Sequence, residues 1–98
     1  MKYIKVRWKH DSPEVPVLLL SELDDDRMEV RKIEVFRDGH CDVADGQDEG
    51  AKTRLGVVPV PTLQDINANR EFEAVEIEGR EFVDAWTAAL GSLSSPRS

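Results

Sequence analysis

Two histidines and their neighbours are the first candidates for chemistry in this sequence. His10 precedes Asp11, and a histidine beside a carboxylate can act as a general base or contribute to a metal site. On a strand, however, adjacent side chains point to opposite faces. The pair is therefore explained more simply as the end of a strand and the start of a turn.

The second histidine lies in a segment that holds all the ligand types zinc accepts. The segment contains His40, Cys41, Asp42 and Asp45. A second cysteine or histidine at ligand spacing is missing, so a half-buried cysteine in a hairpin is the simpler interpretation. The aspartates Asp42, Asp45 and Asp48 also lack the alternate spacing of calcium loops. We predict no metal and no cofactor.

Enzyme classes find little support in the motifs. The sequence has no glycine-rich phosphate loop, no Walker pattern and no dinucleotide fingerprint. The histidines are far apart, and no activated nucleophile accompanies either. An acid pair among Glu22, Asp24 and Glu34 is the remaining catalytic hypothesis, although charged turns and exposed strand faces produce such pairs freely. We predict no catalytic residues and no enzymatic activity.

The whole chain has the size and composition of one globular domain. Its 98 residues are 40% hydrophobic and 34% charged, which predicts one domain over residues 1–91 and a disordered tail over 92–98. The longest apolar run, Val15 to Leu20, falls far short of the ~20 residues of a membrane helix. Because Cys41 has no partner and no apolar leader precedes the first strand, we expect a cytoplasmic protein that does not contact membranes.

The net charge of −7 is unevenly distributed along the chain. Residues 1–37 hold eight basic and eight acidic side chains, whereas residues 38–98 hold five basic and twelve acidic ones. An acidic protein repels phosphate backbones. We therefore predict no nucleic-acid partner and rank such a role third.

The first half of the chain predicts an antiparallel meander. Residues 2–10 alternate, with Ile4, Val6 and Trp8 on one face and Tyr3, Lys5, Arg7 and Lys9 on the other. The apolar run 17–23 suggests a strand covered on both faces or nearly so. The next strand, 28–37, changes phase, which indicates a bulge near Arg31 and Lys32. Asp38-Gly39 then predicts a hairpin to a short strand, 41–44.

Helices are expected in the second half. Residues 45–54 predict an exposed loop and 55–60 an edge segment. Thr62 and Asp65 approximate a capping box for a short helix beginning at Leu63, and residues 72–77 are extended. The apolar spacing over 80–90 predicts a helix that Gly91 ends. The fold class is thus α+β: an antiparallel meander of four to five strands with two helices packed on one face.

The alternation and the helix spacing together predict the hydrophobic core. Its members are Ile4, Val6, Trp8, Leu18, Leu20, Ile33, Val35, Leu63, Ile66, Phe82, Trp86 and Leu90.

Several segments resemble one known family. They are Tyr-Ile-Lys-Val-Arg-Trp-Lys-His (3–10), Ser-Glu-Leu-Asp-Asp-Asp-Arg (21–27), Val-Arg-Lys-Ile-Glu-Val-Phe-Arg-Asp-Gly (30–39), Pro-Val-Pro (59–61) and the stretch from Phe72 to Phe82. In this order they are similar to a family of small, mostly bacterial proteins catalogued as a domain of unknown function. The resemblance covers about residues 3–90, and it implies no activity. Similar sequences carry Ser or Thr at the position of Glu78, which would cap the last helix better.

The outward face of the first strand is the leading candidate for binding. If Ile4, Val6 and Trp8 face the helices, then Tyr3, Lys5 and Arg7 face solvent, and the bulge could bring Arg37 and Lys32 beside them. Tyrosine interleaved with basic residues is typical of surfaces that bind anions or acidic protein patches. Such residues also simply keep an exposed sheet soluble.

A second candidate surface is acidic. It comprises the turn of Asp24, Asp25 and Asp26 and the loop 45–49. Clustered carboxylates steer basic partners and speed their association, although a solvated acidic surface has the same composition.

These features lead to a functional hypothesis. It is a non-enzymatic interaction module with a protein partner, such as an immunity-type inhibitor of a basic toxin. The alternative is a small enzyme or anionic-ligand binder that uses His10 and the basic residues of the sheet. This alternative predicts a concave pocket that contains His10 and one or more arginines. The oligomeric state is left open.

Overall fold

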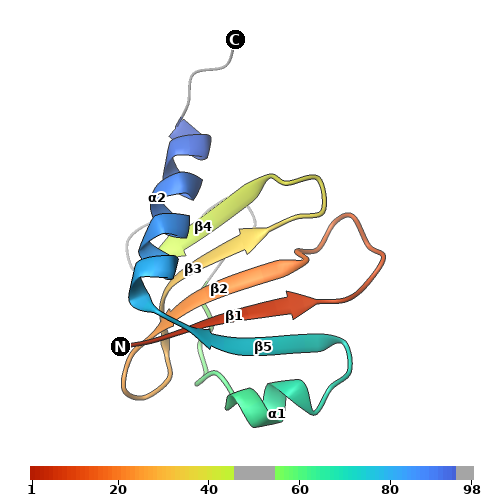
Figure 1. Ribbon diagram of the computed structural model, residues 1–98, viewed down its shortest axis with the longest axis vertical. Helices are drawn as coiled ribbons and strands as arrows, with labels where there is room; N and C mark the ends of the chain where they lie inside the picture. The colour runs from red at the N-terminus through yellow and green to blue at the C-terminus, as the bar shows by residue number, and fades with distance from the viewer. Residues whose placement is uncertain (46–54, 95–98) are drawn as a thin grey trace.

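A computed structural model describes residues 1–45 and 55–94 of the chain. It consists of one sheet and two helices (Figure 1). The elements are β1 (Lys2–Trp8), β2 (Leu18–Leu23), β3 (Glu29–Val35), β4 (Cys41–Asp45), α1 (Leu63–Asn67), β5 (Phe72–Ile77) and α2 (Gly79–Ser94). No helix of the described residues is long and apolar enough to cross a membrane.

The sheet has five antiparallel strands in the order β4-β3-β2-β1-β5. The first four strands form the predicted meander, and the β3–β4 turn places Gly39 at a φ of 94°, a conformation that glycine adopts without strain. β5 pairs with the free edge of β1 after a long connection. The α+β class and the five-stranded antiparallel sheet are confirmed.

The two helices lie on opposite faces of the sheet, whereas the sequence analysis placed both on one face. α1 packs with a cluster built on Ile4, Val6, Leu23 and Ala74. α2 packs with a cluster built on Leu20, Ile33, Phe82 and Ala89. The reason lies in β2, which is apolar in both side-chain phases, so each face must be covered. The run 17–23 had indicated this coverage.

Two local predictions in the strand region need correction. The bulge lies one residue earlier than expected, because Glu22 pairs with Arg31 and Leu23 with Glu29, which leaves Val30 as the additional residue. Residues 55–60 form no strand.

The helix boundaries also differ in part from the prediction. The predicted cap of α1 is confirmed, since the Asp65 N–H donates to Thr62 Oγ1 at 3.2 Å. α2, however, begins at Gly79 and continues through Gly91 to Ser94. The predicted end at Gly91 is wrong, because glycine lowers helix stability without stopping a helix. Residues 46–54 of the predicted loop and 95–98 of the predicted tail lie outside the described part.

Most of the predicted core is packed in one of the two clusters. Leu90 and Trp8 are the exceptions: 42% of Leu90 is exposed, and Trp8 belongs to neither cluster. The two tryptophans also lie in different layers. Trp86 packs on the α2 face, whereas Trp8, at the end of β1, packs against Phe72 with ring centroids 5.6 Å apart.

Candidate functional site

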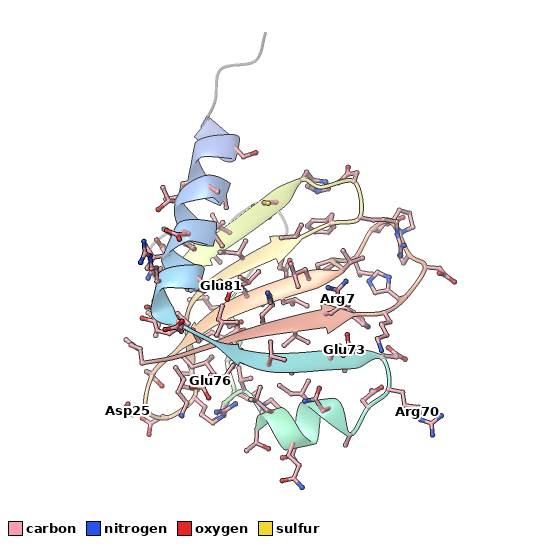
Figure 2. The ribbon with its side chains drawn as sticks, viewed as in Figure 1. Arg7, Asp25, Arg70, Glu73, Glu76 and Glu81 are labelled. Atoms are coloured by element: carbon pink, nitrogen blue, oxygen red, sulfur yellow. The ribbon has the colours of Figure 1, made fainter. Side chains whose placement is uncertain are left out.

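The α2 face is only half covered, and its open half forms a hollow of about 340 Å³ at the end of β1, β2 and β3. α2 lies over the opposite end of these strands, as Figure 2 shows for Glu81 and Arg7. Val17, Leu18 and Val35 form an apolar floor. The walls are Arg7, Trp8, Lys9, His10 and Arg37.

Three cations and one carboxylate set the electrostatics of this hollow, which we call the basic hollow. Arg7 and Lys9 lie on opposite sides of Glu73, at 3.7 and 3.8 Å from its carboxylate oxygens. These side chains are more than half exposed, so the ion pairs are weak and exchange readily with an external anion. Arg37 donates from Nη2 to the backbone oxygen of His10. The hollow therefore holds a net positive charge.

His10 is part of the wall, and backbone groups engage both of its ring nitrogens. Its Nδ1 accepts a hydrogen bond from the Ser12 N–H at 3.1 Å, so the ring proton lies on Nε2. Nε2 donates to the Pro16 carbonyl oxygen at 2.6 Å. His10 therefore fixes the loop between β1 and β2. It does not present a free nitrogen for proton transfer.

Trp8 gives the same wall its rigidity. Its ring lies edge-on to His10, with centroids 4.8 Å apart. The indole N–H donates to Glu71 at 3.1 Å. Because the Trp8 side chain is held by His10 and Glu71, it loses little conformational freedom when a ligand binds.

A smaller hollow of about 220 Å³ continues the basic surface toward β5. Lys5, Arg7 and Val75 line it. The Lys5 ammonium, however, donates to Glu81 of α2 at 2.8 Å. Lys5 therefore binds α2 and contributes less positive charge to the open surface than the sequence suggested.

Tyr3 is not part of the exposed surface. Its ring packs on Phe82, with centroids 5.5 Å apart, because α2 covers this end of the face. The prediction of an outward-facing Tyr3 is thus wrong. Burial, together with a hydrogen bond to the Glu22 carboxylate, raises the pKa of the phenol.

Beneath α2, Glu22 and Arg31 form a bidentate ion pair. The Arg31 Nε and Nη2 atoms donate to the two carboxylate oxygens at 2.7 and 3.1 Å. These hydrogen bonds lower the pKa of Glu22, and the guanidinium lies about 5 Å from the ring centroids of Phe82 and Trp86. Both Glu22 carboxylate oxygens are bound by Arg31, and the Arg31 guanidinium packs on two aromatic rings, so we assign the pair a structural role.

One comparison with known proteins gives a match. The family model described as a domain of unknown function, DUF6881, covers residues 2–91. The chain belongs to this family. No curated protein and no solved structure matches it.

The acidic turn of this DUF6881 domain lies at the other end of the sheet from the basic hollow, as the positions of Asp25 and Arg7 in Figure 2 show. Asp24 Oδ1 accepts hydrogen bonds from the backbone N–H groups of Asp26 and Met28, both at 2.9 Å. Asp24 is therefore a turn-forming residue, whereas Asp25 and Asp26 are exposed.

The remaining candidates do not come together in the DUF6881 domain. Glu22 and Glu34 lie on opposite faces, which excludes an acid pair of these two residues. Glu22 binds Arg31 instead, and Asp24 Oδ1 binds the backbone of its own turn. Lys32 lies 3.5 Å from Glu29, on the α1 face, and not beside Arg7. His40 stacks on Phe36 and contacts Asp38. Burial raises the pKa of the Cys41 thiol. Within residues 1–45 and 55–94, no three acidic, histidine or cysteine side chains are grouped to hold a metal ion.

The sequence missed several residues of the basic hollow. Alternation places Lys9 on the same face as Arg7, but Lys9 was not among the predicted binding residues. Glu73, Val17 and Val35 come from other segments, and no local pattern places them beside Arg7. Their positions follow from the pairing of β1 with β2 and β5.

Proposed function

We propose that this protein is a non-enzymatic interaction module that binds an acidic segment of a partner protein in the basic hollow. The observation that supports it is the combination of Arg7, Lys9 and Arg37 around an apolar floor outside the area covered by α2. Arginine binds carboxylates through paired donors, and the floor accepts the apolar side chains between them.

The geometry of His10 favours binding over catalysis. A general base needs a nitrogen within hydrogen-bond reach of the proton that it removes. Both nitrogens of His10 instead bind the backbone of the β1–β2 loop. The role of His10 in this proposal is to hold the wall, and the cations carry the recognition.

Two other functions are supported by narrower observations. A small anionic ligand would use the same cations, because the hollow of about 340 Å³ is within the range of small-molecule sites. An immunity-type inhibitor of a basic toxin would use the exposed Asp25 and Asp26, which suit electrostatic steering. A cytoplasmic location is part of the proposal and is supported by the unpaired Cys41.

A charge reversal tests the basic hollow. The probe is a fluorescein-labelled peptide of alternating glutamate and leucine, and its affinity is measured by fluorescence anisotropy. Arg7→Glu should weaken binding about tenfold, since it replaces an attraction with a repulsion. The matched control is Arg70→Glu, which makes the same charge change at an exposed residue beyond the hollow (Figure 2).

A second variant should change affinity in the opposite direction. Glu73→Gln removes the carboxylate that Arg7 and Lys9 share, and the peptide should then bind more tightly. Equal losses for Arg7→Glu and Arg70→Glu would show that only net charge matters, and the proposal would fail. Displacement of the peptide by inorganic phosphate at similar affinity would favour the small anion. A hexalysine peptide that loses affinity for Asp25→Lys would favour the toxin inhibitor.

A further inference from the structure

The opposite face of the sheet holds a separate pocket of about 410 Å³. It lies between the sheet on one side and, on the other, α1 and the segment that precedes α1. Its apolar lining comes from Ile4, Val6, Leu19, Val60, Ile66 and Phe72. Ile4 and Val6 are buried at its base, whereas the other four are partly exposed. This volume falls within the range of small-molecule sites.

Val60 and Pro61 form the outer wall of this pocket, and their segment, residues 56–61, is bonded to β3 and to the turn before it. Arg27 donates from Nε and Nη2 to the carbonyl oxygens of Val60 and Pro61, at 2.7 and 2.6 Å. The Val60 N–H returns a bond to the Arg27 carbonyl at 2.8 Å. The Gly56 N–H donates to Glu29 at 2.6 Å. These bonds fix the position of the wall relative to the sheet without a ligand, so the pocket is largely preformed.

The polar groups of the pocket select for positive charge. Its charged lining residues are Glu29 and Asp65, and both are acids. Glu29 accepts from Ser21 Oγ at 3.2 Å, and the Lys32 ammonium lies 3.5 Å from it. Glu29 is therefore balanced by a neighbour. Asp65 is exposed at the mouth, where its carboxylate can meet a ligand cation.

We propose that this pocket binds a small molecule with an apolar body and an ammonium group. The body would occupy the space over Ile4, Val6 and Leu19, and the ammonium would face Asp65. An anionic ligand would meet the Asp65 carboxylate, which the Glu29–Lys32 pair does not neutralise, and is disfavoured. The site lies on the opposite face of the sheet from the basic hollow and shares no lining residue with it.

Three compounds of one shape test this assignment. 2-Phenylethylammonium, 2-phenylethanol and phenylacetate share a phenyl ring but carry positive, neutral and negative groups. Each is titrated into the intact chain while amide chemical shifts are recorded. We expect saturable shifts around Ile4, Leu19 and Ile66, with the ammonium bound most tightly and phenylacetate least. Saturable shifts elsewhere, or no saturation for the ammonium, would overturn the proposal.

Two variants distinguish the contribution of the Asp65 charge to binding from the contribution of the cavity. Asp65→Asn should weaken the ammonium about two- to fivefold and leave the alcohol unchanged, since an exposed ion pair contributes little more. The matched control, Asp84→Asn, makes the same change on the exposed side of α2. Leu19→Trp should fill the cavity and abolish binding of both compounds while the amide spectrum stays folded. Retained binding in that folded variant would exclude the pocket as the site.

Discussion

At the scale of single residues, the Glu22–Arg31 ion pair is a contact that stabilises the fold. The Glu22 side chain is only 8% exposed, and it accepts two hydrogen bonds from Arg31. Removal of one residue of a buried ion pair destabilises the protein, because the charge of the other residue then stays desolvated and unpaired. The pair thus explains why a charged residue sits in the middle of an apolar strand.

Glu22→Gln should lower the free energy of unfolding by about 3 kcal/mol, because it leaves the Arg31 charge without its counter-ion. Denaturant unfolding measures this loss. Glu76→Gln is the matched control. Glu76 lies 4.0 Å from Lys2 and is more than half exposed, so its loss should stay below about 0.5 kcal/mol. Equal effects of the two substitutions would contradict the buried role of Glu22.

The same carboxylate predicts an acid-sensitive stability. The hydrogen bonds from Arg31 hold the pKa of Glu22 below its usual value of 4.5 in the folded state. Its stabilisation is therefore complete above the unfolded pKa and is lost as the pH falls through the folded pKa. Unfolding curves recorded from pH 7 downward should show a smaller loss of unfolding free energy for Glu22→Gln than for the wild type. Parallel losses would argue against this carboxylate as a contributor.

At the scale of elements, α1 protects an edge of the sheet despite its short length. The Asn67 amide spans the outer side of β5, since Nδ2 donates to the Ala74 carbonyl at 2.9 Å and Oδ1 accepts from the Ala74 N–H at 2.6 Å. An unpaired strand edge is a template for pairing with another chain. The side chain therefore occupies backbone groups that would otherwise be open to association.

Asn67→Ala should cost about 1–2 kcal/mol in unfolding free energy, because two hydrogen bonds are lost. It should also increase self-association, which sedimentation velocity at rising protein concentration would detect. Gln64→Ala, at an exposed position of the same helix, should change neither quantity. A stable and monomeric Asn67→Ala would show that the edge needs no cover.

At the scale of the whole molecule, the sheet divides two surfaces with different charge preferences. The basic hollow lies on the α2 face, and the pocket with Glu29 and Asp65 lies on the α1 face. Effects of substitutions that share no partners are expected to add. The two proposed sites should therefore respond independently.

Arg7→Glu should leave the affinity for 2-phenylethylammonium unchanged, and Asp65→Asn should leave the affinity for the acidic peptide unchanged. Both variants together should show the sum of the single effects within about 0.5 kcal/mol. Titration of each probe against the double variant measures this sum. A larger deviation would mean that the two faces are coupled through the sheet.

The sequence by itself determined the strands, most turns and the α+β class, because alternation, Asp38-Gly39 and the Thr62 cap act over a few neighbouring residues. It also identified Arg7, Arg37 and His10, and the ligand-binder alternative placed His10 and arginines in one pocket, but the apolar floor of Val17 and Val35 was not predicted. The placement of α2 over Tyr3, the pairing of β5 with β1 and the pocket beneath α1 depended on the tertiary structure. Both faces of the sheet are apolar, so local periodicity could not decide which helix covers which face. Packing between distant segments made that choice.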